Sequence, residues 1–179
     1  MADFDIDRFV ALSGAIQLDD LDWDECRRIG ITPTEARILR YMEDTETHTI
    51  LYMRDLLAGH SAKDQGSCDF LSVWAYEELW HGRALKKVLD VGGWPEPPER
   101  YAQVTETASM REFVEMILSS LGAWATPRFI AAHMTWGAIN ELTAAAAYQA
   151  LEARTQNPIL AQLRRRIVMQ ERKHYAFYY

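Results

Sequence analysis

Cysteine is scarce in this 179-residue sequence, which contains only Cys26 and Cys68. The two cysteines follow neither a metal-binding nor a redox spacing, which argues against a thiolate site and for a reduced environment. Glycine is also scarce, with nine residues, and no low-complexity run occurs, so a disordered chain is excluded. We therefore expect one ordered domain with a substantial core.

Long apolar runs are absent as well. No run approaches the ~20 residues that a membrane span needs. The first ten residues, MADFDIDRFV, are acidic and lack the basic-then-apolar layout of a signal peptide. We expect a soluble, cytoplasmic protein without a membrane span.

Basic residues are fewer than acidic ones: the chain has 19 Lys and Arg residues and 26 Asp and Glu residues, which gives a net charge of −7. A general nucleic-acid binder needs the opposite balance, and no cluster of basic and aromatic residues indicates a specific one. We therefore expect no nucleic-acid partner.

The sequence is rich in helix-start signals, which divide residues 32–179 into a predicted all-α bundle. The clearest is a capping box formed by Thr32 and Glu35, with Pro33 at the first helical position. We expect four long helices, which begin at Thr32-Pro33, at Ser67 or Asp69, at Thr126-Pro127 and at Asn157-Pro158. The third of them is apolar nearly all round and is expected to be deeply buried.

Two segments lie outside the four long helices. Residues 94–125 form a long connection between the second and third helices, and a capping box at Ser109 predicts a short helix within it. Residues 1–31 are predicted to form an arm of one or two short helices, with Asp19 or Asp20 as a cap. We expect this arm to pack across the outside of the bundle.

Two of the long helices carry a glutamate followed three residues later by a histidine, a spacing that places both side chains on one helix face. Both pairs interrupt an apolar seam, where charged groups are costly to bury without a partner. The other two helices each place a single acid in the corresponding seam. The six candidate ligands are Glu46, Glu78, His81, Glu141, Glu171 and His174.

These six residues are predicted to meet at one height in the bundle. Each lies about 15 to 18 residues from a helix–helix turn near residue 63 or near residue 156, and a helix rises ~1.5 Å per residue. Two antiparallel hairpins packed together therefore bring four carboxylates and two imidazoles into one layer. A buried ion-pair network without metal is the alternative reading of this layer.

Oxygen and nitrogen donors without a thiolate suit iron or manganese better than zinc. We expect two Fe ions, with Mn as the other possibility. Two adjacent ferrous ions can reduce O2 by two electrons, and apolar walls would keep such a site dry.

At these residues the chain resembles the ferritin-like di-iron carboxylate superfamily, and within it the soluble acyl-carrier-protein desaturases. The segments that carry the resemblance are WAYEELWHGRAL in the second helix and ILAQLRRRIVMQERKHYAFYY in the fourth. The resemblance implies a ferritin-like four-helix bundle over residues 32–179, with the long crossover between the second and third helices and residues 1–31 as the arm.

The resemblance also implies a role for each candidate residue. Glu78 and Glu171 would bridge the two metals, and the terminal ligands would be Glu46, His81, Glu141 and His174. Glu77 matches a carboxylate that orients a histidine ligand, while Gln170 stands where the family usually has Asp. Where oxygen-activating members place a Thr after the third-helix glutamate, this chain has Ala144 and Ala145.

The function expected from this pattern is a di-iron, O2-dependent oxidoreductase that acts on a fatty acyl group or another apolar substrate. The substrate could be a small molecule or be held on an acyl carrier, and an external donor would supply electrons. We also expect a homodimer. The alternatives are a ferritin-like iron-oxidising protein without an organic substrate and a helical partner-binding domain with a structural metal.

Overall fold

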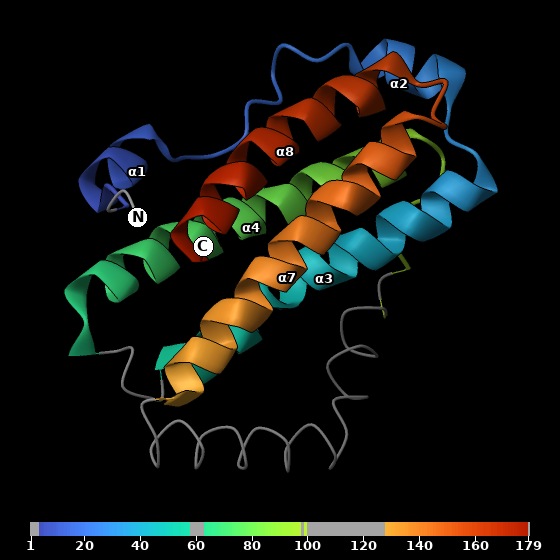
Figure 1. Cartoon of the computed structure of the whole chain (residues 1–179). Coiled ribbons are helices and arrows are strands. Elements are labelled where there is room, and N and C mark those ends of the chain that lie inside the picture. Colours follow the sequence, from blue (N-terminus) through green and yellow to red (C-terminus); the bar gives the residue numbers. More distant parts are fainter. Residues whose placement is uncertain (1–3, 58–62, 98, 100–127, 179) are drawn as a thin grey trace.

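The computed structural model describes residues 4–57, 63–97, 99 and 128–178, which contain six helices and no strand. The elements are α1 (Ile6–Leu12), α2 (Trp23–Ile29), α3 (Pro33–Leu57), α4 (Gln65–Val91), α7 (Arg128–Glu152) and α8 (Pro158–Tyr178). Figure 1 shows the four long helices side by side, with α1 and α2 against the outside of this group. The all-α prediction is confirmed for the described residues, which are compatible with a helical bundle and contain two short helices, α1 and α2, before the long ones.

The bundle consists of two antiparallel pairs. Helix α3 packs along α4, and α7 packs along α8, whereas contacts between the two pairs are fewer (Figure 1). The pairs therefore stand further from one another than the helices within each pair, which leaves space for long side chains at their interface.

Two predicted helix starts are confirmed. The hydroxyl and the backbone N–H of Thr32 both donate to Glu35 Oε2, at 2.6 and 2.7 Å, so the capping box closes in front of α3. The Asn157 Oδ1 atom accepts from the backbone of Ile159 at 3.1 Å and so caps α8. Its Nδ2 group donates to Gly30 O at 3.0 Å, which ties the start of α8 to the end of α2.

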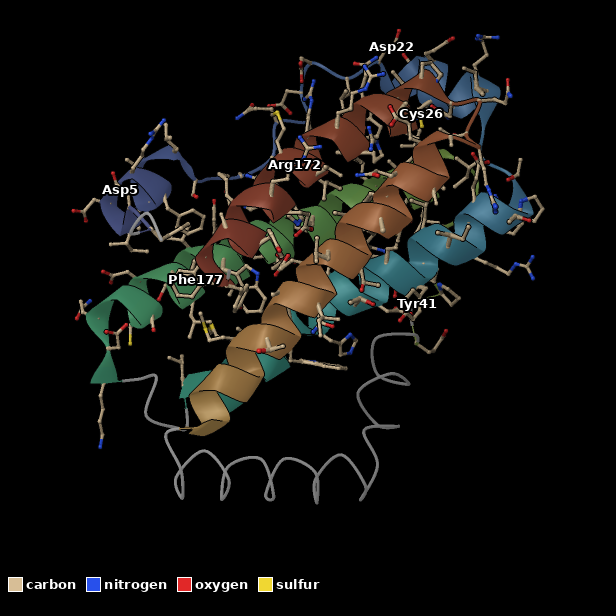
Figure 2. The ribbon with its side chains drawn as sticks, in the orientation of Figure 1. Asp5, Asp22, Cys26, Tyr41, Arg172 and Phe177 are labelled. Carbon is tan, nitrogen blue, oxygen red and sulfur yellow. The ribbon has the colours of Figure 1, made fainter. Side chains whose placement is uncertain are left out.

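Two other helix starts were predicted wrongly. Helix α4 begins at Gln65 with Asp64 as its cap, rather than at Ser67 or Asp69, because the Asp64 carboxylate reaches the Ser67 N–H at 2.7 Å. In the arm, Asp22, rather than Asp19 or Asp20, caps α2, whose C-cap is Gly30, and α1 is capped by Asp5; Figure 2 labels both Asp caps. Asp20 instead pairs with Arg166 on α8.

Helix α7 is less buried than its composition predicts. Trp136, Ile139 and Leu142 are 56%, 48% and 51% exposed, so a wide apolar face of this helix is uncovered by the described residues. Figure 1 shows the reason: α7 lies at the front of the bundle, with its outward face away from the other helices drawn as ribbon. Ile50 of α3 is also 53% exposed.

Two glycines allow close helix approach next to the middle of the bundle. A Cβ atom added at Gly82 would lie 2.8 Å from Thr47 Oγ1, and one added at Gly137 would lie 2.5 Å from the Tyr178 ring. Any side chain at either position would therefore push α4 from α3, or α7 from α8.

Two apolar clusters flank this middle region. One lies toward α2 and includes Leu39, Leu85 and Ile167; the other contains the aromatic residues around Phe70 and Trp74. No helix among the described residues is long and apolar enough to cross a membrane. The helix predicted from Ser109 and the start predicted at Thr126-Pro127 lie outside the described residues.

Candidate metal centre

The structure brings all six candidate ligands together, with at least one from each long helix. Glu46 comes from α3 and Glu141 from α7, while α4 and α8 each supply a glutamate and the histidine three residues later. All six side chains are buried. They meet because the four helices present their inward faces at the same height, as the counting of residues from the turns predicts.

The six residues form two overlapping groups of four. One group is Glu46, Glu78, His81 and Glu171, and the other is Glu78, Glu141, Glu171 and His174. Within each group, one donor atom from every residue lies within 4.8 Å of the others. Glu78 and Glu171 belong to both groups, so two neighbouring cations could share these two carboxylates.

The two histidines face the carboxylates through the same ring atom. His81 Nδ1 lies 3.2 Å from Glu171 Oε1, and His174 Nδ1 lies 3.0 Å from Glu78 Oε1. The two imidazole centroids are 5.9 Å apart. The arrangement is nearly symmetric, with a histidine on each side of the two shared carboxylates.

Outer hydrogen bonds fix both histidine rings with Nδ1 inward. His174 Nε2 lies 2.8 Å from Glu77 Oε2, an acceptor, so Nε2 carries the proton and Nδ1 is left to face the centre. His81 Nε2 lies 2.8 Å from Gln170 Oε1. The Gln170 amide is oriented by its nitrogen, which donates to two acceptors, Glu77 Oε1 at 2.7 Å and Gly14 O at 2.9 Å.

The remaining glutamates are held by neutral donors. The Tyr148 hydroxyl donates to Glu46 Oε1 at 2.7 Å, and the Trp74 indole N–H donates to Glu141 Oε1 at 3.1 Å. Both donors are buried. Each of these carboxylates therefore keeps one oxygen fixed by the protein and the other directed toward the histidines.

Several inner atoms have no hydrogen-bond partner. Glu78 Oε1, Glu171 Oε1 and His81 Nδ1 are fully buried and make no hydrogen bond of acceptable geometry, although carboxylates and imidazoles lie close by. Buried polar atoms are normally satisfied, and these three all point into the same space. The donor atoms are of a type that binds cations, they are buried, and three of them lack a hydrogen bond, so the group fits a cation.

Without bound cations, burial and the neighbouring charges shift the pKa values of the groups in this cluster strongly. Burial and the charge of Glu78 raise the pKa of Glu46 well above its usual value, and burial and the charge of Glu171 do the same for Glu141. Burial alone would lower the pKa of His81 and of His174, but the surrounding carboxylates outweigh it and raise both well above the usual value.

The shared carboxylates behave in the opposite way. Burial raises the pKa of Glu78, but hydrogen bonds, the first of them with Glu46, outweigh burial and hold it well below its usual value. Burial and the charge of Glu78 raise the pKa of Glu171, yet the two histidines bring it down to about 2. Protons and divalent cations would therefore compete for the same donors, and two divalent cations would balance the four carboxylates of the cluster.

A cavity of about 400 Å³ between α3 and α7 leads to this cluster. Its inner end is formed by the four carboxylates, and its walls include Met42, Trp74, Ala144 and Ala147. Its outer part carries polar and aromatic groups, among them Tyr41, which Figure 2 shows on the outer side of α3. We call this space the α3/α7 groove.

One contribution to the site was not predicted. Gly14 acts through its backbone, which leaves no signal in residue type. Tyr148, seven residues after Glu141 and so on the same helix face, lies near the centre as that spacing predicts. His48 also lines the α3/α7 groove, and its Nδ1 atom lies 2.6 Å from Asp44 O.

No protein-family model matches the chain, and neither does any curated protein or solved structure. The functional conclusion therefore depends on the chemistry of the site itself.

Proposed function

We propose that this chain is a ferritin-like di-iron carboxylate protein, and that it acts as an O2-dependent oxidoreductase related in its site to the acyl-carrier-protein desaturases. The observation that carries the proposal is the pair of buried donor groups that share Glu78 and Glu171. Their inner atoms lie at ion-pair distance from one another but make no well-directed hydrogen bond, and four carboxylates against two imidazoles leave an excess of negative charge that bound cations would neutralise.

Iron is the metal that we propose, with manganese as the other choice. Four carboxylates and two imidazoles without a thiolate are typical of these ions. Bound iron would supply the two electrons needed to reduce O2 at such a centre, and an external donor would restore them.

The protein's own residues hold the donors and keep water away. Tyr148 and Trp74 orient the two outer glutamates, while Glu77 and Gln170 orient the histidines. The apolar clusters on both sides of the layer limit access by solvent. This leaves the α3/α7 groove as the described route by which a substrate can reach the centre.

The α3/α7 groove supports an apolar substrate. Its walls are largely hydrocarbon and indole, and its inner end is anionic, so an anionic group would be repelled from the carboxylates unless metal were bound. A fatty acyl group, free or on a carrier, or another neutral apolar molecule fits this description. Replacing Ala147 by Phe should fill the groove and weaken binding of a neutral apolar dye such as N-phenyl-1-naphthylamine, without changing metal content.

The test of the metal centre is anaerobic titration with ferrous iron followed by exposure to O2. We expect two ions per chain and a near-ultraviolet band from oxygen bridging two ferric ions. Glu171→Ala should lose both ions, because Glu171 belongs to both donor groups. Glu25→Ala, which removes a partly exposed carboxylate of α2 that pairs with Arg28, is the matched control and should bind iron normally.

The outcomes separate the alternatives. A wild-type protein that binds no iron, or a Glu171→Ala variant that keeps both ions, would contradict the proposal. Iron that is oxidised but accumulates as a mineral in a large assembly would instead identify an iron-oxidising protein without organic substrate. Sedimentation of the purified chain would test the expected homodimer at the same time.

A further inference from the structure

The end of α1 reaches the metal centre through the outer hydrogen bonds of the histidines. The Gly14 N–H donates to Glu77 Oε1 at 3.1 Å, and the Gly14 carbonyl accepts from Gln170 Nε2 at 2.9 Å. These are the two residues that orient His174 and His81. The backbone of Gly14 therefore makes hydrogen bonds to both side chains that orient the imidazoles.

A lysine of α8 joins the same contact. Lys173 Nζ lies 3.3 Å from Glu77 Oε1, 3.4 Å from Leu12 O and 3.5 Å from Ser13 Oγ. Glu77 Oε1 thus receives donors from the arm and from α8, while Glu77 Oε2 is left for His174. We call Leu12, Ser13 and Gly14 the arm contact.

The arm contact is anchored on both sides along the chain. Before it, Phe9 is buried and its ring packs 5.2 Å from that of Phe70 on α4. After it, Arg166 of α8 donates to the carboxylate of Asp20 and to Gln17 O. The position of the arm contact is therefore set by packing before it and by charge after it, and Phe9 also lies edge-on to the His174 ring, with 6.3 Å between the ring centroids.

The arm contact controls which way the Gln170 amide points. With the Gly14 carbonyl in place, the amide nitrogen has two acceptors on its side and the amide oxygen must face His81 Nε2. A flipped amide would offer N–H to Nε2, which would move the ring proton to Nδ1, the atom that faces the carboxylates. An Nδ1 atom that carries a proton cannot bind a metal ion.

We propose that the arm contact is part of the metal centre: it positions both histidines, and docking of the arm and binding of metal stabilise one another. This inference rests on the metal-binding part of the proposed function and is independent of the reaction catalysed. Thermodynamic linkage makes the effect reciprocal, so that metal must protect the arm to the same extent that the arm strengthens metal binding.

The backbone at Gly14 permits a closely matched pair of variants in the full chain. Gly14→Pro removes the N–H that donates to Glu77, and the preceding Ser13 has the extended conformation (φ −93°, ψ 156°) that a following proline requires. Gly14→Ala keeps both backbone groups, and its Cβ would meet no atom within 4 Å. Gly14→Pro thus loses a hydrogen-bond donor that Gly14→Ala keeps, and it also fixes the φ angle of this residue.

Cobalt(II) alone serves as the probe, since it binds such donors and shifts the NMR signals of nearby protons. We expect Gly14→Pro to weaken cobalt binding about tenfold, the usual scale for losing a partner behind a ligand, and Gly14→Ala to bind like wild type. Two exchangeable imidazole N–H signals should be shifted in the wild-type protein, and those signals should move or broaden in Gly14→Pro. Trypsin cleavage after the exposed Arg8 should slow when cobalt is added.

The outcomes discriminate clearly. Equal cobalt affinity in Gly14→Pro and Gly14→Ala, or a Gly14→Pro variant that loses thermal stability without metal but keeps the wild-type N–H shifts, overturns the arm contact as a positioning element. Cleavage after Arg8 that cobalt does not slow overturns the mutual stabilisation. A wild-type chain that binds no cobalt overturns the metal centre itself, and this inference with it.

Discussion

The two halves of the candidate metal centre have the same kinds of inner donor but different outer partners. The His81 half contains Glu46 and His81, supported by Tyr148 and Gln170; the His174 half contains Glu141 and His174, supported by Trp74 and Glu77. Each half therefore has one glutamate held by an aromatic donor and one histidine held by an oxygen acceptor.

The difference lies in the charge of the histidine's partner. A carboxylate behind His174 makes this imidazole a stronger donor than His81, which has a neutral amide behind it. We infer that a cation in the His174 half is bound more tightly. The amide is required because Gln170 must also donate to Glu77, so one side chain links the two halves.

The largest expected effect is the loss of one ion when an outer glutamate is removed. Glu46→Ala should empty the His81 half and Glu141→Ala the His174 half, because each residue belongs to only one donor group. Metal analysis after equilibrium dialysis against ferrous iron should give about one ion per chain for each variant. The ion kept by Glu46→Ala should be the tighter one; the reverse order would contradict the difference between the halves.

Stability of the protein without metal should fall as pH rises. The pKa values of Glu46 and Glu141 are raised in the folded state, so their contribution is complete below the unfolded value of 4.5 and is lost above it. The raised pKa values of His81 and His174 act in the same direction above 6.5. Glu78 and Glu171, whose pKa values are lowered, lose their contribution only as pH falls below 4.5.

Urea unfolding in the presence of EDTA, from about pH 5 to about pH 8, measures this loss. The same series with metal should be flat or should rise with pH, since cations replace the protons that the cluster would otherwise need. If the free energy of unfolding rises with pH in both series, the pKa values of Glu46, Glu141 and the two histidines are not raised in the folded protein. That result would weaken the case for cations in both halves.

Replacing Gln170, the neutral partner of His81, by a charged glutamate should not make the two halves equal in metal affinity. Gln170→Glu places a second carboxylate beside His81, but that carboxylate would also face Glu77 Oε1 and the Gly14 carbonyl, where the amide nitrogen now donates. We expect metal affinity to fall about tenfold rather than rise. The double variant Gln170→Glu with Glu77→Gln, which restores one donor between the two positions, should recover part of the loss in a cobalt titration.

The inner donors of both halves could be predicted from the sequence because they lie on long helices. Pro33 and Pro158 mark two helix starts, and counting residues from the turns gives the height of each donor in the bundle. The spacing from Glu78 to His81 then places two donors on one helix face. The prediction therefore brought six residues to one layer, as the structure does.

The outer partners depend on features that residue type does not reveal. Gly14 contributes only backbone groups, from a segment without regular structure, and its position is set by the packing of Phe9 and by the pairing of Asp20 with Arg166. The exposure of α7 was mispredicted for a related reason, because an apolar composition does not tell which faces neighbouring helices cover.

The smallest expected effects come from the aromatic donors to the two outer glutamates. Tyr148→Phe removes the hydroxyl that donates to Glu46, and Trp74→Phe removes the indole N–H that donates to Glu141. A hydrogen bond to a charged group contributes about 1.5 to 3 kcal/mol, so each change should lower the stability of the metal-loaded protein by about that amount or less. Tyr148→Phe is the cleaner test because it removes a single atom, whereas Trp74→Phe also leaves a cavity beside Phe70.

Stoichiometry should stay at two ions per chain in both variants, because neither donor is a ligand. The ion nearest the altered glutamate should dissociate faster, in the His81 half for Tyr148→Phe and in the His174 half for Trp74→Phe. Stopped-flow release to a chelator resolves the two ions if their rates differ. If Tyr148→Phe accelerates the slower phase, the tighter ion lies in the His81 half, and the neutral amide of Gln170 supports its histidine better than the Glu77 carboxylate supports His174.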